Sequence, residues 1–388
     1  MKILQIISSM QPENGGMCQG IRNTIPELQK LGITNDVICL DNPNSDYLGK
    51  DCFPIYALGE AKTAWKYNKD LLSWLNINFK NYDKIIVHGL WSYHSYAAIK
   101  VFIEFKKARK ETPNLYVMPH GMLDPYFQKA ESRKLKALRN DFYWKFFEKN
   151  VINSADGVLF TCEEELLLAK TTFPNYLPKQ ELNVGYGIQS PPNFKPTMRE
   201  TFASKVPNWN GKPFLLFLSR IHTKKGVDLL IEAYLQLEHE IESIPQLIIA
   251  GPGREESYGI AMQKLASKSK NILFPGMLSG DAKWGAFYTS EVFVLPSHQE
   301  NFGIAVVEAL ACSKPVLISN KVNIWREIKN GNGGIVKEDT GKETYDLLKK
   351  WFQLSVSEKD KMSQNAENVF SKHYTIKQAA KKLHDSIS

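Results

Sequence analysis

The sequence of 388 residues lacks several features that would assign a protein to a class directly. No apolar run approaches the ~20 residues that a membrane-spanning helix needs. The apolar run that begins the chain is too short for a signal peptide, and neither low-complexity tracts nor internal repeats occur. We therefore expect a globular cytoplasmic protein, which can also lie peripherally at the inner face of a membrane.

The cysteines provide no framework for disulfides or for zinc. There are five of them, they are scattered along the chain, and no two have the C-x-x-C spacing of a metal site. An odd number of scattered cysteines also argues against a set of disulfides. We therefore expect reduced thiols.

What the sequence does contain is a regular alternation of strand-like and helix-like segments. Apolar, β-branched runs such as KILQIIS, KIIVHG and QLIIAGPG are bounded by turn residues, and stretches with helical periodicity lie between them. This alternation predicts an α/β doubly wound fold, with parallel sheets covered on both faces. The stretch GIQSPPNFKP, residues 187–196, separates two sets of about five strands. We expect two Rossmann-like domains, over 1–190 and 191–373, and a helix over 374–388 that packs back on the first.

Two carboxylates, Glu300 and Glu308, flank a point where a strand gives way to a helix that begins near Gly303. Ligands bind at the carboxyl ends of strands in such sheets, and glycine at a helix N-terminus lets a phosphate approach the backbone N–H groups. Glu308 tilts back toward the same end of the helix and can accept two hydrogen bonds from the paired hydroxyls of a ribose. Glu300 would face the far end of the diphosphate, where a sugar would sit. The alternative is that both carboxylates only cap the helix.

Two cations, Arg220 and Lys225, lie in the same predicted domain. Arg220 follows the strand FLLFL, and Lys225 precedes an apolar helical pattern. Fixed positive charges at a strand end, beside a helix N-terminus, would neutralise a leaving diphosphate. The alternative is that both are solvated loop residues.

These residues resemble the C-terminal domain of the retaining glycosyltransferases of family 4, which have the GT-B fold. The resemblance rests on Arg220, Lys225-Gly226 and the E-x7-E pair Glu300 and Glu308, which is followed by EALACSKPV. It implies that the arginine and the lysine bind the donor diphosphate, that Glu308 binds the ribose, and that Glu300 contacts the transferred sugar. Ser313 stands where the family usually has glycine, and we expect no loss from so small a side chain.

The resemblance extends to the first domain through the Gly15-Gly16 loop and the turn Pro119-His120-Gly121. It implies that His120 lies near the anomeric carbon, although a single histidine is more often structural. The glycine loop would let the backbone approach the donor or the acceptor, and its alternative is an ordinary tight turn.

The resemblance to family 4 also bears on the remaining site residues. The residues after the strand QLIIA and near Phe274–Leu278 resemble the nucleobase and ribose wall, whereas Glu256 breaks the dinucleotide pattern GxGxxG. Expected catalytic residues are His120, Glu300, Arg220 and Lys225. Expected donor-binding residues are Gly15, Gly16, Ser219, Arg220, Lys225, Gly251, Arg254, Met277, Leu278, Glu300, Asn301, Phe302, Gly303, Ile304 and Glu308. Expected acceptor-binding residues, for which packing is an equal alternative, are His88, Trp91 and Asp124.

The implied activity is a retaining hexosyltransferase of polysaccharide biosynthesis. It would move a hexose, with glucose as the first candidate, from a UDP-sugar to a saccharide or lipid-linked saccharide acceptor. In the implied front-face mechanism, the acceptor hydroxyl attacks from the side on which the diphosphate leaves. No two aspartates have the D-x-D spacing that holds divalent cations in the other large glycosyltransferase fold, so we expect neither metal nor cofactor. The alternatives are a sugar-nucleotide epimerase of the same fold and a catalytically silent saccharide-binding protein.

The charge points to anionic partners. The net charge of +8 fits a sugar nucleotide, an anionic membrane or a nucleic acid, but no nucleic-acid-binding module is recognisable. Residues 129–149 carry seven basic residues against three acidic ones, with aromatic residues interleaved. This stretch could lie on an anionic membrane, or it could be a solvated helix that packs its aromatic side chains into the first domain.

Overall fold

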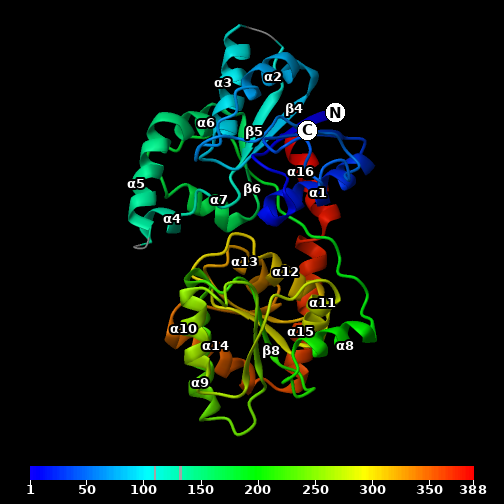
Figure 1. Cartoon of the computed structure of the whole chain (residues 1–388), viewed down its shortest axis with the longest axis vertical. Helices are drawn as coiled ribbons and strands as arrows, with labels where there is room; N and C mark the ends of the chain where they lie inside the picture. The colour runs from blue at the N-terminus through cyan, green and yellow to red at the C-terminus, as the bar shows by residue number, and fades with distance from the viewer. Residues whose placement is uncertain (109–110, 131–132) are drawn as a thin grey trace. The chain divides into compact units, whose positions relative to one another are not determined.

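The computed structural model describes residues 1–108, 111–130 and 133–388. They divide into two compact units, Met1–Gly187 with Ile376–Ser388, and Ile188–Thr375. Each unit is built on a parallel sheet with helices against it (Figure 1). The expected domain boundaries, after residues 190 and 373, lie within a few residues of this division.

In the described chain, the first unit has a seven-stranded sheet in the order β3-β2-β1-β4-β5-β6-β7. Every neighbouring pair is parallel. Because helices cover such a sheet on both faces, its inner strands are continuous apolar runs, as in β4, where Ile85, Ile86 and Val87 are fully buried. The strands are β1 Lys2–Ile6, β2 Thr34–Cys39, β3 Ile55–Ala57, β4 Lys84–His88, β5 Asn114–Met118, β6 Gly157–Phe160 and β7 Glu181–Asn183.

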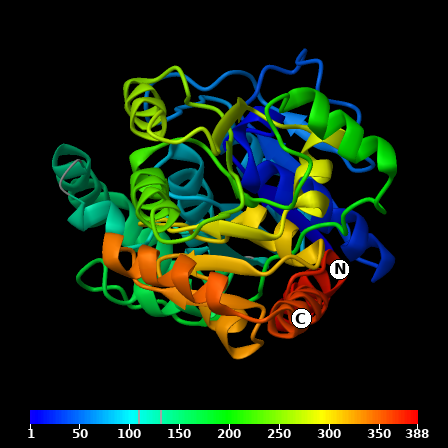
Figure 2. The ribbon, with the colours of Figure 1, turned by 90° about the horizontal axis from the view of Figure 1, so that it is seen from below.

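The helices of the first unit include α16, which comes from the far end of the sequence. Its residues Ala380, Leu383 and Ile387 share an apolar cluster with Leu28 of α1 and Ile3 of β1. The two termini of the chain therefore lie close together (Figures 1 and 2). The helices are α1 Gly16–Lys30, α2 Leu71–Asn78, α3 Tyr93–Lys107, α4 Tyr126–Lys129, α5 Lys134–Tyr143, α6 Lys149–Ser154, α7 Glu163–Ala169 and α16 Ile376–Ile387, with a π-helical turn, Trp144–Glu148, between α5 and α6.

The second unit has a six-stranded sheet among its described residues, in the order β10-β9-β8-β11-β12-β13. Helix α9 packs beside α10 and α14, and α8 packs beside α11. These two groups lie on opposite sides of the sheet (Figure 1). The strands are β8 Leu215–Leu218, β9 Leu247–Ala250, β10 Ile272–Gly276, β11 Val292–Leu295, β12 Val316–Ser319 and β13 Gly334–Lys337; the helices are α8 Pro196–Lys205, α9 Val227–Glu238, α10 Ser257–Ala266, α11 Gly280–Thr289, α12 Ile304–Ala311, α13 Trp325–Asn330, α14 Gly341–Gln353 and α15 Val356–His373.

Three strands, β3, β7 and β13, were missed by the sequence analysis. Each lies at an edge of its sheet and leaves most of its side chains partly exposed. An edge strand has a neighbour on one side only, so it does not need the continuous apolar run that marks a central strand. The missed strands extend the two sheets without changing the fold class.

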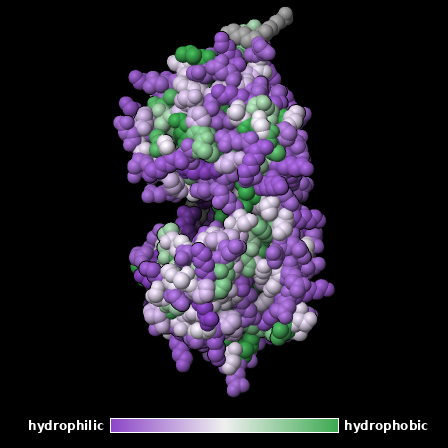
Figure 3. Space-filling model, turned by 90° about the vertical axis from the view of Figure 1, so that its right-hand side faces the viewer, coloured by the Kyte–Doolittle hydropathy of each residue, from purple (hydrophilic) through white to green (hydrophobic). Residues whose placement is uncertain are grey.

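The face of the molecule that Figure 3 presents is largely hydrophilic. Figure 3 shows polar residues over most of the visible face, with smaller hydrophobic groups between them. No helix of the described residues is both long enough and apolar enough to cross a membrane.

Candidate active site

The turn from β11 into α12 carries the expected phosphate-binding backbone. Gly303 is the N-cap residue of α12 and has φ 70° and ψ 63°, a left-handed conformation that glycine adopts without steric cost. A Cβ atom on Gly303 would lie 3.2 Å from Cγ of Glu300, so the two residues are in contact. The first N–H groups of a helix have no acceptor within the helix. Glu300 therefore lies beside the part of α12 that can receive an anion, and Ile304 is the first helical residue.

The backbone of Glu300 is held by a neighbouring loop. Its N–H donates to the carbonyl oxygen of Lys321 at 2.9 Å, and its carbonyl oxygen accepts from the N–H of Asn323, also at 2.9 Å. The side chain of Asn323 donates to Oδ1 of Asn301 at 3.3 Å. Next along the chain, Phe302 is buried. The loop that carries the expected donor-binding residues is thus fixed on both sides of Glu300.

The carboxylate of Glu300 forms an ion pair with Nζ of Lys225. Lys225 is only 6% exposed, so its ammonium group depends on this partner for compensation of its charge. The sequence analysis placed both residues in the site but did not predict that they pair with each other. An anion that binds here would share the ammonium group with Glu300.

Gly226 explains how residues 75 positions apart come into contact. It has φ 65°, and a Cβ atom on it would lie 2.2 Å from the carbonyl oxygen of Pro296. The carbonyl oxygen of Lys224 also accepts a hydrogen bond from Oγ of Ser297 at 2.9 Å. The loop before α9 therefore lies directly on the loop after β11, which brings Lys225 to Glu300.

Glu308 has a partner that the sequence analysis missed. Nζ of Lys283, on α11, lies 2.7 Å from Oε1 of Glu308, and both side chains are largely buried. The ammonium group also lies 4.1 Å from the ring centroid of Trp284. No local pattern signals the contact, because it depends on the packing of two helices whose residues lie 25 positions apart.

Arg220 differs from Lys225 in its surroundings. It is exposed just beyond the end of β8, and it takes part in no ion pair or hydrogen bond within the part of the chain that the structure describes. Gly251 follows β9 and Ser219 follows β8. A Cβ atom on Gly251 would lie 1.9 Å from the carbonyl oxygen of Ser219, so glycine at this position lets the ends of the two strands approach each other. The arginine can therefore turn toward a ligand without breaking a contact.

The expected nucleoside wall lies around the end of β10. Nη1 of Arg254 donates to the carbonyl oxygen of Phe274 at 3.2 Å. Leu278 is buried, whereas Met277 is 72% exposed. These positions lie in the same unit as Arg220 and Glu308.

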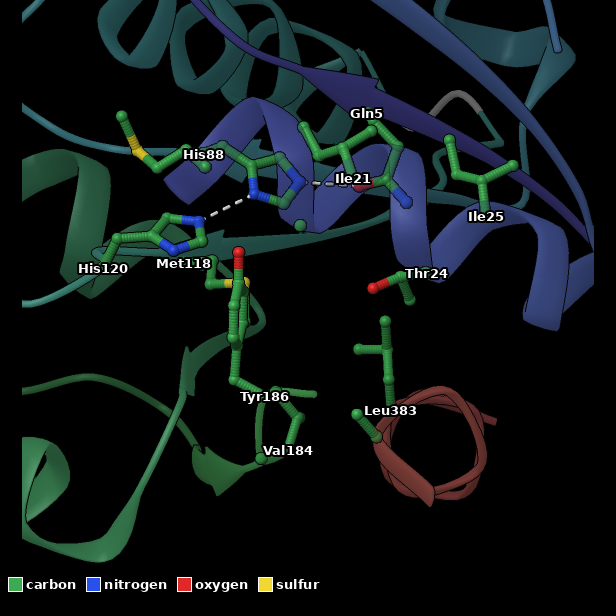
Figure 4. A pocket seen from close by; sticks show the side chains of 14 residues that line it. Gln5, Ile21, Thr24, Ile25, His88, Met118, His120, Val184, Tyr186 and Leu383 are labelled. Carbon is green, nitrogen blue, oxygen red and sulfur yellow. Dashed lines mark hydrogen bonds between the residues drawn. The ribbon is translucent and has the colours of Figure 1, made fainter. Parts of the chain in front are cut away.

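In the first unit, His88 and His120 form a pair (Figure 4). Nδ1 of His88 lies 2.9 Å from Nε2 of His120, and Nε2 of His88 lies 2.7 Å from Oε1 of Gln5. Burial lowers the pKa of His120 to about 4 and lowers the pKa of His88 well below its ordinary value. Both rings are therefore neutral at pH 7. Gln5 was not predicted as part of this site.

The other residues expected in the first unit have structural partners. The N–H of Trp91 donates to Oε1 of Glu148 at 2.9 Å, and Oδ1 of Asp124 accepts from the N–H of Tyr126 at 2.9 Å where α4 begins. Gly15, with φ 79°, is the N-cap residue of α1, and Gly16 is its first residue. Acceptor binding by Trp91 or Asp124 stays a prediction.

A polar cavity of about 540 Å³ lies in the first unit, where β1 and β2 end. The sequence analysis named none of its lining residues as site residues, although the SSM that follows β1 and the DN that follows β2 were visible signals. Hydroxyl, amide and carboxylate groups dominate its lining, a mixture that suits a polyhydroxylated ligand. The lining residues are Ser8, Ser9, Gln11, Leu40, Asp41, Asn42, Ser45, Tyr47, Glu60, Ala61, Thr63 and Lys66.

Known proteins give the class to which this fold belongs. The two parallel-sheet units constitute a GT-B fold. Residues 198–369, most of the second unit, match the family model described as glycosyl transferases group 1. The second unit is therefore a glycosyltransferase domain, which is a domain of transferase enzymes.

Individual relatives share a part of the sequence. An uncharacterised glycosyltransferase from Methanocaldococcus jannaschii is 28% identical over 134 residues, 34% of this chain and 34% of that protein. Mannosylfructose-phosphate synthase from Agrobacterium fabrum is 27% identical over 136 residues, 33% of this chain and 30% of that protein. The chain thus spans about a third of the length of the curated relatives it matches. HepE from Anabaena, solved in complex with UDP-glucose, has the same fold, with a TM-score of 0.71 at 17% identity over 99% of this chain and 98% of HepE.

Proposed function

We propose that the chain is a retaining glycosyltransferase of family 4. It would transfer a hexose, with glucose as the first candidate, from a UDP-sugar to a saccharide or lipid-linked saccharide acceptor. One observation carries the proposal: the Lys225–Glu300 ion pair lies beside Gly303 at the N-terminus of α12. This arrangement combines a cation, a carboxylate and free backbone N–H groups at the carboxyl edge of a parallel sheet. A sugar diphosphate presents the complementary groups, two phosphates and a ring of hydroxyls.

The positive groups would stabilise the leaving diphosphate. As the bond between the anomeric carbon and the phosphate oxygen breaks, negative charge develops on that oxygen. The N-terminus of α12, Lys225 and Arg220 can compensate that charge. In the front-face mechanism, the acceptor hydroxyl attacks from the side on which the diphosphate leaves, and its proton passes to the released phosphate oxygen. A protein base is then unnecessary, and we propose that no metal ion is needed.

The carboxylates would hold the two ends of the donor. Glu308, kept in place by Lys283, can accept hydrogen bonds from the two ribose hydroxyls. Glu300 can contact the transferred sugar. HepE, which was solved with UDP-glucose, supports this donor through its shared fold.

The polar cavity at the ends of β1 and β2 is our candidate for the acceptor. Its carboxylates, Asp41 and Glu60, and its hydroxyls can hydrogen-bond to a saccharide.

We also propose that residues 133–149 contact an anionic membrane. Two residues of the expected stretch 129–149, at positions 131 and 132, lie outside the described residues. Trp144 is buried, which agrees with the alternative that this segment packs its aromatic side chains into the first domain. Four other apolar side chains are exposed and recur at helical spacing: Leu135 at 85%, Leu138 at 67%, Phe142 at 55% and Phe146 at 58%. Lysine and arginine residues alternate with this apolar stripe, as on helices that lie at lipid surfaces.

The direct test is to incubate the protein in EDTA with a panel of UDP-, GDP- and ADP-sugars, with and without oligosaccharide acceptors. We expect one donor to be converted to free nucleoside diphosphate, and expect Glu308→Ala and Arg220→Ala to lose at least 90% of this turnover. Glu232→Ala and Arg199→Ala, which change exposed residues on α9 and α8, are the matched controls.

The rival functions give different results in the same assay. An epimerase would convert the sugar nucleotide without releasing free nucleoside diphosphate, and acceptor would not change its rate. A catalytically silent saccharide-binding protein would turn over no donor. If no sugar nucleotide is turned over or bound, the proposed function is wrong.

A further inference from the structure

Asn35, Gln5 and His88 form, in this order, a chain of buried polar side chains that runs across three neighbouring strands of the first sheet. Gln5 lies on β1, Asn35 on β2 and His88 at the end of β4, and their exposures are 3%, 2% and 6%. Apolar residues surround them in these strands, and burying unpaired polar groups there would be costly. Each member of the chain is instead hydrogen-bonded to the next.

The direction of this chain follows from its first acceptor, a backbone carbonyl oxygen. Nδ2 of Asn35 donates to the carbonyl oxygen of Ile33 at 3.4 Å. A carbonyl oxygen can only accept, so the amide NH₂ group of Asn35 faces it and Oδ1 of Asn35 faces Gln5. Nε2 of Gln5 then donates to this Oδ1 at 2.9 Å, which turns Oε1 of Gln5 toward His88.

The same logic fixes the protons of both histidines. Oε1 of Gln5 can only accept, so the proton of neutral His88 is on Nε2, which lies 2.7 Å away. Nδ1 of His88 therefore has a lone pair and accepts from Nε2–H of His120 at 2.9 Å. Figure 4 shows both hydrogen bonds in line from Gln5 to His120. With its proton on Nε2, neutral His120 is left with a lone pair on Nδ1.

We infer that Gln5 and His88 are positioning residues that hold His120 in one tautomer, with Nδ1 as a hydrogen-bond acceptor for a ligand hydroxyl. Within the described part of the chain, Nδ1 of His120 has no hydrogen-bond partner, and the residue is only partly buried. Its φ of 53° is a strained value for a residue other than glycine, of the kind that occurs at functional sites. The inference rests on the proposed function in naming a sugar hydroxyl as the group that donates to Nδ1.

The assignment predicts what His120 can recognise. In this tautomer Nδ1 can accept from a hydroxyl but cannot donate to a phosphate oxygen. His120 would therefore contact the sugar rather than the leaving phosphate, a choice that the sequence left open.

The test is nuclear magnetic resonance of protein with ¹⁵N-labelled histidine, in long-range ¹H–¹⁵N correlation spectra at pH 7. In the wild type we expect both His88 and His120 to carry the proton on Nε2. In Gln5→Leu, the acceptor for His88 is lost, so we expect the His120 signals to move toward those of the other tautomer. Thr24→Val, a change of similar size in the wall of the same cavity, should leave both tautomers unchanged.

A wild-type His120 with its proton on Nδ1 overturns the inference, and so does a His120 tautomer that Gln5→Leu leaves unchanged. The wild-type spectrum decides the first point even if Gln5→Leu fails to fold. In the transfer assay, we expect Gln5→Leu to lower kcat/KM for the donor about two- to tenfold, the worth of one hydrogen bond. The spectra need no substrate. If the protein shows the expected tautomers but transfers no sugar, the proposed function is wrong and the tautomer assignment stands.

Discussion

Lys283 shows how a single side chain can orient a carboxylate in the proposed nucleotide site. Its ammonium group pairs with Glu308 at 2.7 Å, and this pairing restricts the carboxylate to one orientation. A carboxylate that is already oriented loses less conformational entropy when it binds two hydroxyls. We therefore treat Lys283 as a positioning residue for Glu308.

Lys283→Met keeps most of the side-chain packing and removes the charge. We expect KM for the donor to rise about three- to tenfold, because the carboxylate is no longer held in one orientation and ordering it on binding costs about 1 kcal/mol. Steady-state kinetics with varied donor concentration measure the effect. The matched control is Lys349→Met, which removes a more exposed ion pair to Glu240 in the same unit. An unchanged KM in Lys283→Met would contradict the positioning role.

At the scale of elements, the segment from α5 to α6 combines a buried carboxyl group with an exposed apolar stripe. Glu148 lies in the π-helical turn and accepts hydrogen bonds from the N–H of Trp91 and the hydroxyl of Ser95. Burial raises the pKa of Glu148 to about 8. The turn thus ties this helical segment to the core through a carboxyl group that is neutral at pH 7.

The raised pKa of Glu148 makes stability depend on pH. Between about pH 4.5 and 8, the native state keeps a proton that the unfolded chain has lost, so this group lowers the free energy of unfolding as pH rises, by up to about 1.4 kcal/mol per pH unit. In Glu148→Gln, this dependence is lost. We expect the stability of the variant relative to the wild type to increase from pH 5 to pH 8 in urea denaturation. If the difference in the free energy of unfolding between Glu148→Gln and the wild type stays constant from pH 5 to pH 8, the raised pKa of Glu148 is contradicted. Glu232→Gln, at an exposed position, is the control.

The apolar stripe predicts binding to anionic vesicles. We expect the protein to float with vesicles of phosphatidylglycerol and phosphatidylcholine at low salt, and not with phosphatidylcholine alone. The double change Leu138→Ser and Phe142→Ser should reduce the partition coefficient at least about tenfold, because two large apolar side chains no longer enter the lipid. Leu177→Ser, at a position 70% exposed in the same unit, should bind as the wild type does. Equal binding by the double variant would contradict a membrane role for this stripe.

At the scale of the whole molecule, donor binding should appear as a gain in stability. A ligand that binds only the native state stabilises it by about 2.7 kcal/mol at a concentration of 100 times Kd. We expect UDP in EDTA to raise the Tm by a few degrees, and uridine, which lacks the diphosphate, to have little effect. Thermal denaturation followed by fluorescence measures the shift. Glu308→Ala should lower it, and no shift with millimolar UDP would contradict a UDP-binding site.

Much of the fold could be predicted from the sequence, because the central strands of a covered parallel sheet are continuous apolar runs. KIIVH and LIIA identify β4 and β9 for this reason. The edge strands β3, β7 and β13 were missed, since pairing with a single neighbour requires little apolar surface. The fold class follows from the central strands alone, and the exact size of each sheet does not.

The sequence by itself determined two α/β units with parallel sheets, because the central strands of such sheets are continuous apolar runs, whereas the GT-B fold was implied by the resemblance to the family 4 glycosyltransferases. Tertiary structure alone decided which charged and polar groups meet. Lys225 pairs with Glu300, Lys283 with Glu308, and Gln5 with His88 across 75, 25 and 83 positions. No local periodicity encodes such contacts, because they arise where separate loops, helices and strands pack together.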